Sequence, residues 1–217
     1  MISPLATIDV RYPAIADSAT VRDYCRIEGY DVKIGERAWL DYYAFIGGGS
    51  CHDPLSRLVM GDDCHMGMWS VINTAREVTI GNEVGIGIRT SIFTHGAYLS
   101  ALDGFPYKFA PVMIGDRVWL PNAIVSPGVT IGDDVVVLPN SVVTQDIPSG
   151  SLAAGTPCKV IETNAFPKTL TADERREIVA QVEIDAALIE TFGEREPGSA
   201  LENQFRRYGV RGRNGTV

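Results

Sequence analysis

The sequence is short of the residues that build disulfide scaffolds and zinc motifs. Its 217 residues include only four cysteines and three histidines, and no two cysteines form a Cys-x-x-Cys pair. Paired cysteines are the usual sign of a secreted, disulfide-bonded fold or of a structural zinc site. We therefore expect free thiols in a cytoplasmic protein, and no bound metal.

Positive charge is also scarce. The chain has 19 Lys and Arg against 27 Asp and Glu, a formal net charge of -8. Nucleic acids and anionic membranes bind basic faces, so neither is expected as a partner. No apolar run approaches the roughly 20 residues of a membrane span. The first residues lack the basic and apolar segments of an export signal, so none is predicted.

A six-residue period dominates the chain. Six matches neither the period of 2 of a surface strand nor the 3.6 of a helix. A short fixed period of this kind is typical of a coiled parallel sheet, in which each unit forms one side of a prism and three units close a turn. We predict an all-β fold of about six coils over residues 15–147, with residues 1–13 as a lead-in. The aliphatic positions are Ile15, Val21, Ile27, Ile34, Leu40, Ile46, Met60, Met66, Ile72, Ile80, Ile86, Ile92, Ile114, Leu120, Ile131, Val137 and Val143.

The fifth residue of each six-residue unit, counted from its aliphatic residue, supports the prism, because it is usually small, as the crowded corner of a narrow prism requires. The small residues are Ala19, Cys25, Ala38, Ala44, Ser50, Cys64, Ser70, Thr90 and Ser141. Two stretches without the pattern, 47–58 and 94–111, are predicted loops. One step is short, since Leu120 to Ile131 spans eleven residues rather than twelve. We expect a tightened corner at 126–128.

The C-terminal part lacks the six-residue period and has a helical pattern instead. We expect the coil domain to cover 1–161 and a C-terminal helix and tail to cover 162–217. Thr171-x-x-Glu174 has the form of a capping box at a helix start. An apolar stripe at helical spacing follows, and Gly193 is expected to end the helix. The stripe consists of Ile178, Val182, Ala186, Leu188, Ile189 and Phe192.

Several motifs together resemble one family, the hexapeptide-repeat acyltransferases, and most closely its sugar and xenobiotic O-acetyltransferases. They are Ala110-Pro111-Val112-Met113-Ile114-Gly115-Asp116, Val118-Trp119-Leu120, Pro127-Gly128-Val129-Thr130-Ile131-Gly132, Ser141-Val142-Val143-Thr144, Asp146-Ile147-Pro148 and the run from Ala153 to Ile161. The resemblance implies a left-handed parallel β-helix, a homotrimer with active sites between subunits, and transfer of an acetyl group from acetyl-CoA to a hydroxyl or amine of a sugar. Only the resemblance implies the left hand, since parallel crossovers are generally right-handed.

Acyl transfer needs a base for the proton of the nucleophile, and histidine is the natural base near neutral pH. His95 opens the second predicted loop directly after the aliphatic register. The resemblance implies that the general base stands at such a strand-to-loop junction, so His95 is the predicted base. His52, beside Asp53, is the second choice, and His65 is expected to be structural.

The resemblance also implies ligand contacts. The residues expected to bind acetyl-CoA are Asn122, Pro139, Thr144, Gln145, Gly155 and Lys159. Gln145 stands where the family has a lysine. The two polar sugar contacts of galactoside-type members are replaced here by Gly67 and Ala75. The acceptor is therefore expected to bind nearby residues and the second loop instead: Trp69, Asn73, Arg89, Tyr98 and Asp103. An aromatic ring such as Trp69 suits the apolar face of a sugar.

Two other classes stay open. The resembled fold also hosts zinc carbonic anhydrases, which need three histidine ligands. The gaps of 13 and 30 residues between the three histidines do not match the close ligand pair of those enzymes. A non-catalytic β-helix subunit is the other alternative, and it predicts no coenzyme A binding.

Overall fold

A computed structural model describes residues 1–181 of the chain. It divides the chain into two compact units, Met1–Pro167 and Lys168–Val217. The sequence pattern placed the boundary slightly earlier, after residue 161. Within the described residues, no helix is long and apolar enough to cross a membrane.

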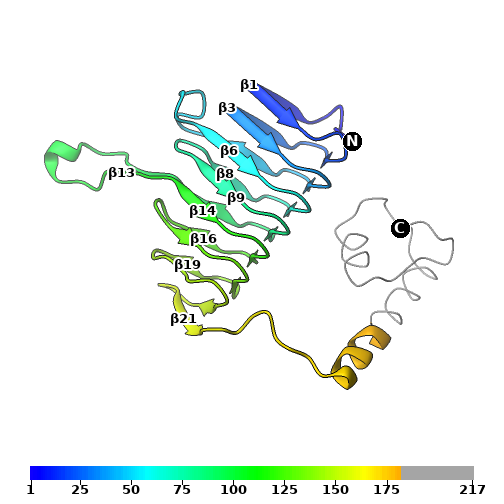
Figure 1. Ribbon diagram of the computed structural model, residues 1–217. Helices are drawn as coiled ribbons and strands as arrows, with labels where there is room; N and C mark the ends of the chain where they lie inside the picture. Colours follow the sequence, from blue (N-terminus) through cyan, green and yellow to red (C-terminus); the bar gives the residue numbers. More distant parts are fainter. Residues whose placement is uncertain (182–217) are drawn as a thin grey trace. The chain divides into compact units, whose positions relative to one another are not determined.

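The first unit winds into a coil with three flat faces (Figure 1). Face one is a sheet of parallel strands that ends in one antiparallel strand, β21. Its strands are β2 (Thr20–Val21), β4 (Trp39–Leu40), β7 (His65–Met66), β10 (Gly85–Ile86), β15 (Trp119–Leu120), β18 (Val136–Val137), β20 (Leu152–Ala154) and β21 (Lys159–Glu162).

Faces two and three belong to one sheet that bends at β3 (Arg26–Ile34). The start of β3 pairs with β5 and its end pairs with β6. Face two continues through β5 (Phe45–Gly47), β8 (Val71–Asn73), β11 (Ser91–Ile92), β16 (Ile124–Val125) and β19 (Val142–Val143). Face three continues through β6 (Arg57–Met60), β9 (Val78–Ile80), β14 (Val112–Ile114) and β17 (Thr130–Ile131). The predicted parallel prism is confirmed, and its left hand stays a prediction from the resemblance.

The prediction of a lead-in at residues 1–13 is wrong. β1 (Thr7–Ile15) pairs in parallel along the whole of β3, so the first coil starts there. The β1 sequence begins Thr-Ile-Asp-Val and alternates with period two, which a search for period six passes over. Ile8 and Val10 pack against the core from this strand. Face one accordingly holds seven parallel strands, β2 to β20, rather than about six coils.

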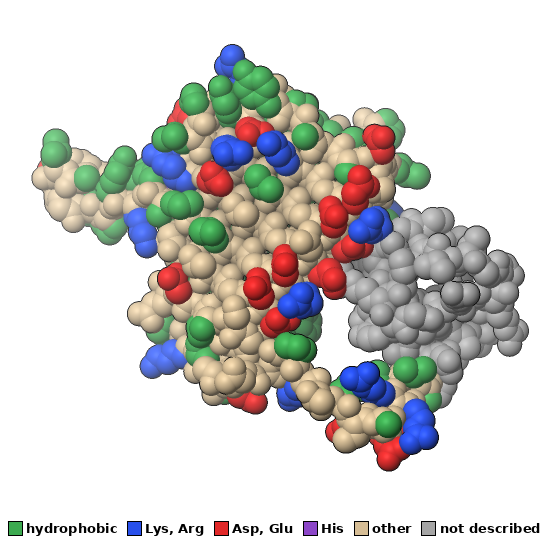
Figure 2. Space-filling model, viewed as in Figure 1, with side chains coloured by type: hydrophobic (Ala, Val, Ile, Leu, Met, Phe, Trp, Pro, Cys, Tyr) green, Lys and Arg blue, Asp and Glu red, His purple; other side chains and the backbone are tan. Residues whose placement is uncertain are grey.

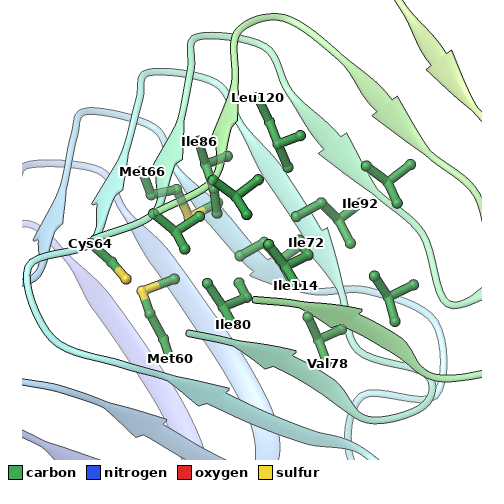
Figure 3. Close-up of a cluster of buried hydrophobic side chains, with 14 of the residues drawn as sticks. Met60, Cys64, Met66, Ile72, Val78, Ile80, Ile86, Ile92, Ile114 and Leu120 are labelled. Atoms are coloured by element: carbon green, nitrogen blue, oxygen red, sulfur yellow. The ribbon is translucent and has the colours of Figure 1, made fainter. Parts of the chain in front are cut away.

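The aliphatic positions of the six-residue pattern fill the interior of the prism. Figure 3 shows buried side chains of this pattern, among them Ile72, Ile86 and Leu120, pointing into one continuous cluster. These three side chains are fully buried. The small corner residues are buried too, except Ser50, which is exposed in the first loop. Close packing of this kind makes the interior intolerant of volume changes.

The short step lies at a different corner from the one predicted. Val125 is the buried residue between Leu120 and Ile131, and it follows Leu120 by five residues. The corner at 121–123 is therefore one residue short, and 126–128 is not. The hydroxyl of Thr90 spans this corner, donating to the Leu120 carbonyl at 2.6 Å and accepting from the Ala123 amide at 3.3 Å.

The three corners of the prism differ in chemistry. The aromatic corner, between faces one and two, carries Tyr24, Tyr43, Trp69 and Arg89, each with a φ of 55° to 61°. The charged corner, between faces three and one, carries the ion pairs Arg37–Asp63 and Arg117–Asp134. Figure 2 shows acidic side chains gathered along an edge of the coil with basic side chains among them. The loop corner, between faces two and three, is where both predicted loops leave the coil.

The second loop forms a projecting arm (Figure 1). Its base is the antiparallel pair β12 (His95–Gly96) and β13 (Lys108–Phe109), and it carries a short 3-10 helix, η1 (Ala101–Asp103).

In the second unit, residues 172–181 are helical. The capping box is confirmed, because Glu174 accepts from the Thr171 amide at 2.8 Å and the Glu174 amide donates to the Thr171 hydroxyl at 3.2 Å. Ile178 is exposed. The remaining residues of the predicted apolar stripe, and Gly193, lie outside the described residues.

Candidate functional site

His95 lies at the loop corner, three residues beyond Ile92, the buried end of β11. Its backbone pairs with Phe109 across the base of the arm. The imidazole ring stacks on the Phe109 ring, with centroids 5.3 Å apart and planes 24° apart. The arm, which departs from the six-residue pattern, therefore positions one side of His95.

The other contact of the imidazole comes from the preceding coil. His95 Nδ1 lies 2.7 Å from Oδ1 of Asn73, the last residue of β8. Asn73 Nδ2 donates to the Gly47 carbonyl at 3.2 Å, which assigns the oxygen of the amide to the side facing His95. An oxygen accepts only, so Nδ1 is the protonated nitrogen. In the neutral ring, Nε2 then carries the lone pair, which a general base requires.

Thr94 ties Asn73 into a wider network. Its hydroxyl lies 2.9 Å from the Asn73 carbonyl and 3.0 Å from Asn73 Oδ1. The same hydroxyl oxygen accepts from the Arg76 amide at 3.0 Å. Asn73 is only 4% exposed and Thr94 is fully buried, so these bonds are shielded from water. The imidazole is thus attached to a rigid part of the coil.

Nε2 of His95 faces the first loop. A Cβ placed on Gly49 would come 3.8 Å from Nε2 and from Cε1. Gly49 has no side chain, so no Cβ stands against the nitrogen that holds the lone pair. The two loops that interrupt the pattern therefore meet at the proposed reacting atom.

The residues expected to bind the acceptor do not form one group. Trp69 and Arg89 lie on the aromatic corner, where Trp69 has the Tyr43 ring 6.2 Å away and the Arg89 guanidinium 5.4 Å away. The Trp69 side chain remains 47% exposed, so its contact with an acceptor stays a prediction. Asn73 is buried and engaged by His95, so its position differs from that of an acceptor contact. Tyr98 and Asp103 lie on the arm and are exposed.

The residues expected to bind acetyl-CoA are divided between corners. Asn122, Pro139 and Gly155 follow one another along the aromatic corner, where Asn122 donates to the Asn140 side chain at 3.0 Å. Thr144 and Gln145 are exposed at the loop corner after β19.

Gly155 has a φ of +103°, which disfavours any other residue there. Its amide donates to the Ser141 hydroxyl at 3.0 Å. Lys159 opens β21 opposite Ala154 and is exposed.

The other two histidines make different contacts. His52 Nε2 lies 3.9 Å from an Asp9 carboxylate oxygen rather than forming the suggested pair with Asp53. His65 lies on face one, where burial lowers its pKa and Asp41 opposes that shift. Among the described residues, no group of three His, Cys, Asp or Glu side chains is arranged to hold a metal ion.

Sequence reasoning missed three members of the His95 network: Thr94, Arg76 and Phe109. The guanidinium of Arg76 lies 4.6 Å from the centroid of the Phe109 ring. Phe109 falls in a loop without periodicity, so no pattern placed it opposite His95. Thr94 carried one unused signal, because a polar residue directly before a candidate base can hold the partner of that base.

Comparison with known proteins gives a consistent result. A model described as "Bacterial transferase hexapeptide (six repeats)" matches residues 111–145. Galactoside O-acetyltransferase of Escherichia coli K12 is 34% identical over 132 residues, covering 59% of this chain and 62% of that protein. The chain thus spans less than two thirds of the length of this curated relative.

Two solved structures are similar as well. A Vibrio cholerae hexapeptide-repeat-containing acetyltransferase, complexed with acetyl coenzyme A, superposes with a TM-score of 0.51 and 28% identity, covering 60% of this chain and 69% of that one. A hexapeptide transferase family protein of Anaplasma phagocytophilum gives a TM-score of 0.57 at 20% identity, covering 85% and 98% of the two chains. The second likeness concerns the fold alone.

Proposed function

We propose that this chain is a member of the hexapeptide-repeat acetyltransferase family, and that it transfers an acetyl group from acetyl-CoA to a hydroxyl or amine of a sugar. The main support is the hydrogen bond of 2.7 Å between His95 Nδ1 and Asn73 Oδ1. This bond leaves the lone pair on Nε2, the nitrogen that faces Gly49, as a general base requires. The galactoside acceptor in the name of the Escherichia coli relative favours a sugar as the acceptor.

In the proposed reaction, His95 Nε2 takes the proton of the acceptor hydroxyl or amine as its oxygen or nitrogen attacks the thioester carbon. The new bond joins the acceptor to the acetyl carbon, and the carbon–sulfur bond breaks. The proton held on Nε2 then passes to the departing sulfur, so the base is regenerated. Asn73 keeps Nδ1 protonated throughout, as a positioning residue.

Acetyl-CoA is proposed to bind along the later coils. Asn122, Pro139 and Gly155 present exposed turns there, and the ammonium of Lys159 suits a phosphate. Thr144 and Gln145 lie on the opposite edge of face two. We further propose a cytoplasmic homotrimer, in which the loop corner of one subunit faces a neighbour.

The direct test is turnover of acetyl-CoA, followed as free-thiol release, with a panel of sugars and amino sugars. His95→Ala is expected to lower kcat/KM by about 10²- to 10⁴-fold, the usual contribution of a general base. His52→Ala is the matched control, since His52 is another loop histidine without contact to this network. Full acetyl transfer by the His95→Ala protein would overturn the proposal.

A further inference from the structure

Arg76 is a charged residue that is linked to the proposed base through Phe109 and Thr94. Its guanidinium packs over the Phe109 ring on which His95 also stacks. Its amide is bound by Thr94, which in turn is bound to Asn73. Arg76 and His95 therefore share a neighbour on the arm and a neighbour in the coil.

No carboxylate neutralises this guanidinium in the part of the chain that the structure describes. The adjacent acid, Glu77, lies 3.7 Å from Arg57 and 3.3 Å from the Thr79 hydroxyl instead. The guanidinium that shares the Phe109 ring with His95 therefore keeps its charge available to an anionic ligand.

The guanidinium is also held in place. Arg76 Nη1 donates to the Ala75 carbonyl at 2.6 Å, and the side chain is partly buried. A guanidinium has five N–H donors in a planar fork that matches the oxygens of a carboxylate or a phosphate. Partial burial and a fixed position strengthen such a pair relative to one in open water.

We propose that Arg76 binds an anionic group on the acceptor, so that the preferred acceptor is a sugar bearing a phosphate or a carboxylate. The inference rests on the proposed function and adds the chemical class of the substrate. A neutral sugar would enter the same space without the charge-assisted bonds, and would bind more weakly.

The test uses imidazole NMR signals of the full-length protein, because only three histidines are present. Glucose 1-phosphate, glucuronate and glucose are titrated separately. Either anion, or both, is expected to shift the His95 signal in a saturable way while the His52 and His65 signals stay still. Arg76→Gln is expected to weaken anion binding about ten- to hundredfold, and Arg76→Lys to restore part of it.

Arg11→Gln is the matched control, because its guanidinium also lies over aromatic rings, those of Tyr12 and Tyr30. A shift with the phosphate alone, or with glucuronate alone, identifies which anion the site prefers. The inference is overturned if neither anion shifts the His95 signal, if glucose shifts it equally well, or if Arg76→Gln binds as tightly as the unchanged protein.

Failure of the proposed function has a different signature. It is the retention of acetyl transfer by His95→Ala, whatever the NMR titration shows. In a turnover assay, Arg76→Gln is expected to raise KM for the anionic sugar while leaving KM for acetyl-CoA unchanged. Thermal melts of both Arg76 variants check that the fold is intact.

Discussion

Substitution of Asn73 separates the positioning of His95 from the stability of the coil. In Asn73→Ala, His95 Nδ1 and the Gly47 carbonyl lose their side-chain partner. The Gly47 carbonyl still accepts from the Thr74 amide at 3.3 Å, and the Thr94 hydroxyl still reaches the Asn73 carbonyl at 2.9 Å. The buried Thr94 amide, which donates to Asn73 Oδ1 at 3.4 Å, loses that acceptor, as does His95 Nδ1.

These lost contacts set the expected effects of Asn73→Ala on stability and on kcat. Removal of the side chain breaks its bonds to the Gly47 carbonyl, the Thr94 amide and His95 Nδ1. The expected cost is about 1–3 kcal/mol of unfolding free energy, the range for leaving a buried polar group without its partner. For a chain of this size that lowers Tm by roughly 2–12 °C. Release of the imidazole from its fixed tautomer and orientation is expected to lower kcat about ten- to hundredfold. At 1.36 kcal/mol for each factor of ten, this is a loss of roughly 1.4–2.7 kcal/mol of transition-state stabilisation.

Asn73→Asp is expected to retain more activity and to lose more stability than Asn73→Ala. A carboxylate oxygen can still accept from Nδ1, so more of the activity should survive than in Asn73→Ala. The other oxygen faces the Gly47 carbonyl without a proton between them, and a charge is buried, so more stability should be lost.

The assay is kcat and KM from free-thiol release, measured beside thermal melts for the three proteins. If Asn73→Ala keeps its kcat, or if activity and Tm fall in parallel in both variants, the positioning role of Asn73 is refuted.

Two further predictions concern the coil. Thr90→Val is expected to cost about 1–3 kcal/mol, because the Leu120 carbonyl and the Ala123 amide lose the hydroxyl that spans the short corner. Urea unfolding measures the loss. The control is Thr130→Val at an exposed position, which is expected to stay within about 0.5 kcal/mol of the parent. Equal unfolding midpoints for all three proteins would contradict the reasoning. His65 has a pKa lowered by burial, so below about pH 6.5, the usual pKa of histidine, the unfolded chain binds a proton more readily than the folded one. Stability present above that pH should be lost as the pH falls through the folded pKa, and His65→Gln should show a shallower dependence of Tm on pH between 7.5 and 5; identical slopes would rule the effect out.

The six-residue pattern was sufficient to predict the repeating core. Each unit buries its own aliphatic residue, as Ile72 and Ile86 show, whichever coil lies above or below it. The pattern did not predict the features that depend on contacts between coils. β1 forms by pairing along β3, and the short corner depends on a hydroxyl from residue 90, more than thirty positions before residue 123. Neither relation has a local signature.

The candidate site divides in the same way. The position of His95 at a strand-to-loop junction, together with the family resemblance, identified it from the sequence alone as a candidate base. Only the tertiary structure brought Asn73, 22 residues away in sequence, against one nitrogen of that ring. It also stacked Phe109 on the imidazole and placed Arg76 over the Phe109 ring. Stacking of coils places residues from separate repeats side by side. The sequence by itself therefore determined the core of each repeat, and the contacts between repeats determined which side chains meet at His95.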